Sequence, residues 1–116
     1  MKIQHYKDAP AKYFRNGPAK GVTGRVLIGR DDGASHFCMR IFELEPEGHT
    51  PLHSHDWEHE IFFHSGTGEV YREDHWVPVS QGNAVFIPPG ETHQIRNTGG
   101  DTLAFVCLIP AGAPEL

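Results

Sequence analysis

Short runs of β-branched and aromatic residues, separated by Gly and Pro turns, dominate this chain from residue 25 onward. RVLIG (25–29) and HFCMRIFELEP (36–46) predict two strands around a DDGA turn. Residues 58–74 predict two more around Gly66 to Gly68, HWVPVS (75–80) a short one, and NAVFIPPG (83–90) one that ends at a Pro-Pro-Gly breaker. Residues 93–110 predict a last pair around a turn at 97–101. With no helical period longer than two turns, this spacing predicts an all-β barrel or sandwich.

The chain has 116 residues, which favours one domain with its own core. Residues 1–21 carry no clean periodicity, so we expect an N-terminal arm that packs on the barrel or on a partner subunit, with the barrel itself covering 22–116. The strand expected at 103–109 is apolar on both faces. One of those faces should therefore pack on a second sheet or on another copy of the chain.

Net charge and hydropathy exclude several classes of partner. The formal charge is −5 and the ten basic residues are scattered, so neither a nucleic-acid surface nor an anionic membrane surface is expected. No run approaches the roughly 18 apolar residues of a membrane span, and the N-terminus lacks the apolar core of a secretory signal. We therefore expect a cytoplasmic protein, in which Cys38 and Cys107 stay as thiols.

Histidine is the unusual component, because five of the nine histidines fall between residues 49 and 64. On a strand, His53 and His55 would point to the same side about 6 to 7 Å apart, close enough to share one metal ion. His59 follows after a short turn, and His93 begins another strand after the Pro-Pro-Gly turn. The pattern predicts four imidazoles around one divalent transition metal.

Two gapped motifs around these histidines resemble those of the cupin family. The second cupin motif, G(X)5PXG(X)2H(X)3N, is matched without a gap from Gly82 to Asn97. The first, G(X)5HXH(X)3,4E(X)6G, fits from His53 to Gly66 if His59 fills the Glu position, although Gly48 stands one residue too close. The resemblance covers about 90 residues and implies a single-domain cupin, a jelly-roll-like double-stranded β-helix.

The third ligand has an alternative. Four residues separate Glu60 from His55 and five separate it from Gly66, whereas for His59 these spacings are three and six, as the motif requires. His59 is therefore the preferred ligand and Glu60 the second choice. His5, His36, His49 and His75 are expected to be ordinary surface or core residues, and His64 to lie on the outer face of its strand.

The chain also looks like small bacterial cupins with an all-histidine site, which are commonly manganese-loaded and homodimeric. Imidazole softness alone favours Zn, Cu, Fe and Ni, whereas the resemblance moves Mn, and then Fe, to the front. Four neutral rings leave an octahedral ion its full charge and two free positions, which favours anionic ligands. A zinc ion with four rings would instead have a closed tetrahedral site.

Strand parity predicts that Ile61, Ile95, Phe105 and Cys107 line the barrel mouth around the metal, and Arg40 is a further candidate for this lining. Arg40 would either pair with a Glu of a neighbouring strand or hold a substrate carboxylate. Cys107 has no neighbouring base in the sequence and is expected to be a pocket wall, so no catalytic residue is predicted beyond the metal site.

Two classes of function remain open. The resemblance implies a metal-dependent enzyme, in the first place a dioxygenase-like oxidoreductase that cleaves a carbon-carbon bond of a small aromatic or enol-like substrate. Small cupins also include isomerases and lyases that use the metal as a Lewis acid. The other class is a non-catalytic module in which the metal anchors a sugar acid or a similar anion.

Overall fold

Strands make up nearly all the regular structure of the protein. The computed structural model describes residues 1–116 and contains nine strands and two three-residue 3-10 turns, Tyr6–Asp8 and Arg30–Asp32. The strands are β1 (Lys12–Phe14), β2 (Lys20–Ile28), β3 (Phe37–His49), β4 (His59–Ser65), β5 (Thr67–Arg72), β6 (His75–Ser80), β7 (Ala84–Ile87), β8 (Gln94–Asn97) and β9 (Leu103–Pro110). The all-β fold predicted from the sequence is confirmed.

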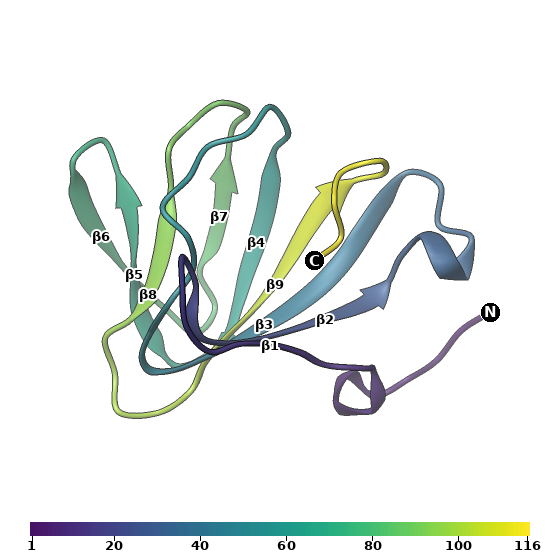
Figure 1. Ribbon diagram of the computed structural model, residues 1–116, viewed down its shortest axis with the longest axis horizontal. Helices are drawn as coiled ribbons and strands as arrows, with labels where there is room; N and C mark the ends of the chain where they lie inside the picture. The colour runs from purple at the N-terminus through teal and green to yellow at the C-terminus, as the bar shows by residue number, and fades with distance from the viewer.

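All pairings are antiparallel and follow the order β6-β5-β8-β3-β9-β4-β7, with β2 and then β1 attached to β3. The long strand β3 joins two walls. One of its edges pairs with β9 from Phe37 to Leu44 and then with β8 at His49. As Figure 1 shows, the sheet curls, so that β5, β6 and β8 lie on one side of the molecule and β2, β3 and β9 on the other.

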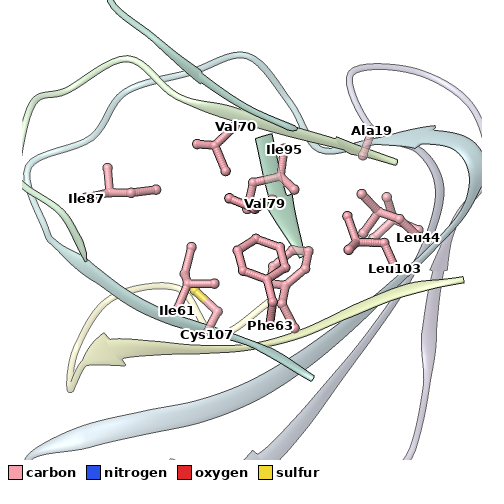
Figure 2. Packing of buried hydrophobic residues seen from close by; sticks show 12 residues of the cluster. Ala19, Leu44, Ile61, Phe63, Val70, Val79, Ile87, Ile95, Leu103 and Cys107 are labelled. Atoms are coloured by element: carbon pink, nitrogen blue, oxygen red, sulfur yellow. The ribbon is translucent and has the colours of Figure 1, made fainter. Parts of the chain in front are cut away.

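The core fills the space between the two walls. Burial alternates along β4, where His59, Ile61 and Phe63 are buried and the residues between them are exposed, as the period of two predicts. Phe63 is fully buried, and its ring packs at a tilt of 47° against that of Phe105. In Figure 2, side chains from β4 and β9 meet those of β5, β6 and β8 across the interior.

Gly66 forms the corner at which the chain passes from one wall to the other. β4 pairs with β7 and β9, whereas β5 pairs with β6 and β8, so the two consecutive strands are not partners of each other. Gly66 has φ +87°, and a Cβ there would lie 2.5 Å from the carbonyl oxygen of Thr102. Both facts favour glycine.

Residues 1–21 contain more regular structure than the sequence indicates. β1 pairs with Val22 to Gly24 of β2, and β2 itself begins at Lys20. Ala9 and Ala19 are buried, whereas Met1 and Ile3 are fully or almost fully exposed. No helix here has both the length and the apolar character that crossing a membrane requires.

Candidate metal centre

The segment that carries His53 and His55 is a loop, which corrects the expectation of a strand. Residues 50–58 have no strand assignment apart from a single bridge, in which His53 and His93 exchange backbone hydrogen bonds of 3.1 and 2.9 Å. A third backbone hydrogen bond, 2.7 Å long, runs from the Gly90 N–H to the His55 carbonyl oxygen. These bonds hold the loop against the turn that follows β7, so the two histidine motifs meet although about 40 residues separate them.

Four imidazole rings converge at this junction. His53, His55 and His93 each offer a ring nitrogen, and the three nitrogens lie within 4.8 Å of one another. The Nε2 atom of His59, from the start of β4, lies 2.9 Å from Nε2 of His55. Two nitrogens that are each about 2.1 Å from one ion, at right angles, would be about 3.0 Å apart, so this pair has the spacing of adjacent ligands.

Hydrogen bonds on the far side of three rings leave their Nε2 atoms free to face one another. His55 Nδ1 lies 2.9 Å from the Trp57 carbonyl oxygen, and His93 Nδ1 lies 2.9 Å from that of Glu91. A carbonyl oxygen only accepts, so both Nδ1 atoms carry the proton and both Nε2 atoms keep a lone pair. His59 Nδ1 contacts the Cys107 sulfur at 3.1 Å. Such outer contacts are typical of metal-binding histidines.

The environment favours the neutral form of His53, His59 and His93, which ligation requires. Partial desolvation, reinforced by the neighbouring histidines and Arg40, lowers the pKa of His53 to about 4, although its side chain is still exposed. Burial and Arg40 lower the pKa of His59 to about 3, and burial also lowers the pKa of His93. His55 stacks on Trp57 with the ring planes 6° apart, which fixes its orientation.

Glu60, the alternative ligand, is turned away from these rings. It lies on the exposed face of β4 beside Glu58, and a hydrogen bond with Glu58 raises the pKa of Glu60 to about 7. His64 is exposed on the same face, as strand parity predicts. The structure therefore brings His59, and not Glu60, to the other three histidines.

A cavity of about 260 Å³ opens beside the four rings. All five residues expected at the barrel mouth, Arg40, Ile61, Ile95, Phe105 and Cys107, line it. Phe42 was not predicted, although it lies two residues after Arg40 on the same strand and shares its parity. The other lining residues were not predictable from strand parity: Phe14, Ala19, Val22, Thr50, Pro51, Trp57, Pro114 and Leu116.

Arg40 is the only basic side chain in the lining other than the histidines, and no acidic side chain lines the cavity. The ion pair with a Glu of a neighbouring strand, one of the two roles expected for Arg40, is formed by Arg25 and Glu43 instead. Arg40 donates to the Glu115 backbone oxygen at 3.2 Å and to the Cys107 sulfur at 3.1 Å, and its buried Nε has no partner. Its charge is therefore left without a counter-ion.

The sequence matches a family model described as a cupin domain over residues 40–109. Among solved structures, the polyketide cyclase RemF from Streptomyces resistomycificus is 38% identical with a TM-score of 0.90, and the match covers 98% of this chain and 82% of RemF.

Two curated relatives are more distant. The oxalate-binding protein of Thermotoga maritima is 35% identical over 80 residues, 66% of each chain. The 1-methylthio-D-xylulose 5-phosphate methylsulfurylase of Rhodospirillum rubrum is 28% identical over 96 residues, 83% of this chain and 60% of the relative. The aligned part thus spans slightly under two thirds of either relative's length.

Proposed function

Since this chain belongs to the cupin family, we propose that its four converging histidines, His53, His55, His59 and His93, bind one divalent transition metal. The main support is that the rings of His55, His59 and His93 are each held by a contact at Nδ1. Their Nε2 atoms are therefore left to face a common point. All four donors are neutral nitrogens, which by softness alone favour Zn, Cu, Fe and Ni. The resemblance to small cupins with an all-histidine site makes Mn the proposed ion, with Fe next and Zn, Ni or Cu as further candidates.

The proposed substrate is a small aromatic or enol-like molecule that carries a negative oxygen. Two features support it. The cavity wall is mainly apolar and aromatic, with Phe42, Trp57 and Phe105 among its members. Arg40 and the ion together would make the cavity cationic, because neither the ligands nor the lining side chains supply a negative charge. Arg40, which lines the cavity and forms no ion pair, would bind an anionic group of the substrate.

We propose a metal-dependent enzyme. A bound divalent ion would supply Lewis acidity to a carbonyl or enol oxygen, and a redox-active one would in addition react with dioxygen. Arg40 would orient the substrate, and the aromatic walls would exclude water. The similarity to RemF over nearly the whole chain favours the Lewis-acid reaction, such as a cyclisation, isomerisation or lyase step, on an enolisable carbonyl compound.

Oxidative carbon-carbon bond cleavage is the second candidate. It is supported by the four-histidine donor set, because four rings around an octahedral ion leave two positions, one for substrate and one for dioxygen. A third reading, a binding module without turnover, has the oxalate-binding relative in its favour.

One experiment separates the three. Protein purified without added metal is analysed for its metal content and then mixed with a β-diketone such as 1-phenylbutane-1,3-dione, with and without oxygen. Turnover that persists without oxygen supports the Lewis-acid enzyme, and cleavage only with oxygen supports the oxygenase. A shift of the enol absorption without any product supports the binding module. Protein that takes up no divalent metal under any condition would overturn the proposal.

We further propose a cytoplasmic homodimer that has no nucleic-acid or membrane partner. The exposed outer face of β4 and β7 supports the dimer, because Phe62 and Phe86 are both more than half exposed there. The N-terminal residues, including the exposed Met1 and Ile3, would pack on the barrel or on the second copy.

A further inference from the structure

A chain of contacts crosses three adjacent strands on the interior face and ends at one of the four histidines. Arg40 lies opposite Cys107 in the β3–β9 pairing, and Cys107 lies opposite Ile61 of β4, two residues after His59. The Cys107 sulfur is 3.1 Å from Arg40 Nη2 and 3.1 Å from His59 Nδ1. All three side chains are more than nine-tenths buried.

The sulfur occupies the place that a carbonyl oxygen occupies behind His55 and His93. Those two rings are held through Nδ1 by the Trp57 and Glu91 backbone oxygens. His59 begins a regular strand whose carbonyls are engaged with β7 and β9, so a side chain of the neighbouring strand must supply the acceptor. Cys107 is the polar side chain that the structure brings to that nitrogen.

Arg40 fixes the direction of one of the hydrogen bonds around the sulfur. A guanidinium has only donors, so the sulfur accepts from Arg40, and its own hydrogen has the Leu108 carbonyl oxygen, 3.9 Å away, as an acceptor. If the thiol instead donated to His59 Nδ1, the ring proton would lie on Nε2, which faces the other histidines. The ring would then have no lone pair to offer.

We propose that Cys107 is a positioning residue of the metal centre: its sulfur accepts the Nδ1–H of His59, and Arg40 holds the sulfur in place. The ring of His59 is thereby kept in the tautomer and orientation that direct Nε2 to the ion. This inference rests on the proposed metal function. It assigns to Cys107 a role beyond that of a pocket wall, because loss of such an outer partner typically weakens metal binding about 10- to 100-fold.

The test compares Co²⁺ and Zn²⁺ affinities of the wild-type protein, Cys107→Ala, Cys107→Ser and Cys38→Ala, measured by competition with a chromophoric chelator. Cys38 is the other buried thiol, on β3, and has no hydrogen bond to a histidine, so Cys38→Ala is the matched control. We expect Cys107→Ala to bind about 10- to 100-fold more weakly with an altered Co²⁺ absorption spectrum. Cys107→Ser, whose hydroxyl also accepts, should recover part of the affinity, and Cys38→Ala should match the wild type.

A second measurement needs no variant. In the ¹⁵N-labelled, Zn²⁺-loaded wild-type protein, long-range ¹H–¹⁵N correlation should show the His59 proton on Nδ1. A proton on Nε2, or equal affinities of Cys107→Ala and the wild type, would overturn the inference and leave the metal site standing. A wild-type protein that binds neither ion would instead overturn the proposed function itself.

Discussion

At the scale of single residues, the chemistry of the site depends on which ring nitrogen of each histidine carries the proton. Backbone carbonyls set this for His55 and His93, and a sulfur contacts the corresponding atom of His59. The nearby Arg40 adds a positive charge that no carboxylate offsets. Neutral imidazoles whose Nε2 lone pairs face one another cannot hydrogen-bond to each other, but they can all bind one metal ion. The guanidinium beside them favours an anion that binds next to that ion.

The choice between His59 and Glu60 gives the first prediction at this scale. His59→Ala should lower the bound metal, measured by elemental analysis, to less than about a tenth of the wild-type content, because removing a ligand costs affinity directly. Glu60→Ala should leave the metal content unchanged, since its carboxylate lies on the outer face. His64→Ala, which removes an exposed histidine of the same strand, is the matched control. Equal loss in all three variants would contradict the ligand assignment.

The pKa values of His53 and His59 give a pH prediction. Both are depressed in the folded chain, to about 4 and about 3, from an unfolded value near 6.5. Below pH 6.5 the unfolded chain binds protons that the folded chain does not, so the free energy of unfolding of the metal-free protein should fall as the pH drops from about 6.5 toward 4. The readout is the Tm of the metal-free protein across this range.

A matched variant isolates the contribution of these two histidines to the pH dependence. His53→Gln combined with His59→Gln keeps polar side chains at both positions but removes the two titrating groups. Its Tm should fall less steeply between pH 6.5 and 4 than that of the wild type, and a parallel decline would show that other groups cause the acid sensitivity.

At the scale of elements, the length of β3 and the corner at Gly66 give the fold its two walls. β3 has 13 residues, enough to pair with β9 along its first part and to reach β8 at its end. Gly66 allows β4 to continue into β5 on the opposite wall with a single residue between them. Together they let the antiparallel sheet curl around the interior, as Figure 1 shows. The cavity beside the histidines is lined by residues of both walls.

Gly66→Ala should therefore destabilise the protein by about 2 kcal/mol or more, because it adds left-handed backbone strain to a close approach to the Thr102 carbonyl. Gly100→Ala is the control, since a Cβ at position 100 meets nothing within 4 Å and its backbone has no positive φ. Denaturant unfolding of both variants gives the comparison. If Gly66→Ala lowers the free energy of unfolding no more than Gly100→Ala does, then the corner can accept a side chain without strain.

At the scale of the whole molecule, one outer face carries two large exposed aromatic side chains. Phe62 of β4 and Phe86 of β7 are 52% and 58% exposed, and they lie on the same face because Glu60 pairs with Phe86 and Phe62 with Ala84. Leu108 of β9 lies opposite Glu60 on that face. An apolar patch of this kind is typical of an interface between subunits.

Light scattering should accordingly report a mass of about two 12.9 kDa chains. Phe62→Glu combined with Phe86→Glu should shift the protein to the mass of one chain, because the charges would oppose each other across a two-fold interface. Val77→Glu, on β6 of the other wall, should leave the mass unchanged. If the wild type runs as a monomer at all concentrations, this face does not join two copies.

The sequence alone determined the strands and the identity of the converging histidines. Alternation with a period of two and Gly or Pro breaks are local signals, so the eight strands from β2 to β9 were predictable, as was the inward direction of His59, Ile61 and Phe63. The spacing of residues within each histidine motif is also a local signal, so it pointed to His53, His55 and His93. β1 was not predicted, since it is only three residues long and depends on β2 for its pairing.

Only the tertiary structure decided what surrounds the histidines. The sulfur behind His59, the missing counter-ion of Arg40 and the contribution of Pro114 and Leu116 to the cavity all join residues that are dozens of positions apart. The loop conformation at His53 and His55 likewise depends on a bridge to His93. Such contacts follow from the register and curl of the whole sheet, which no local pattern of residues encodes.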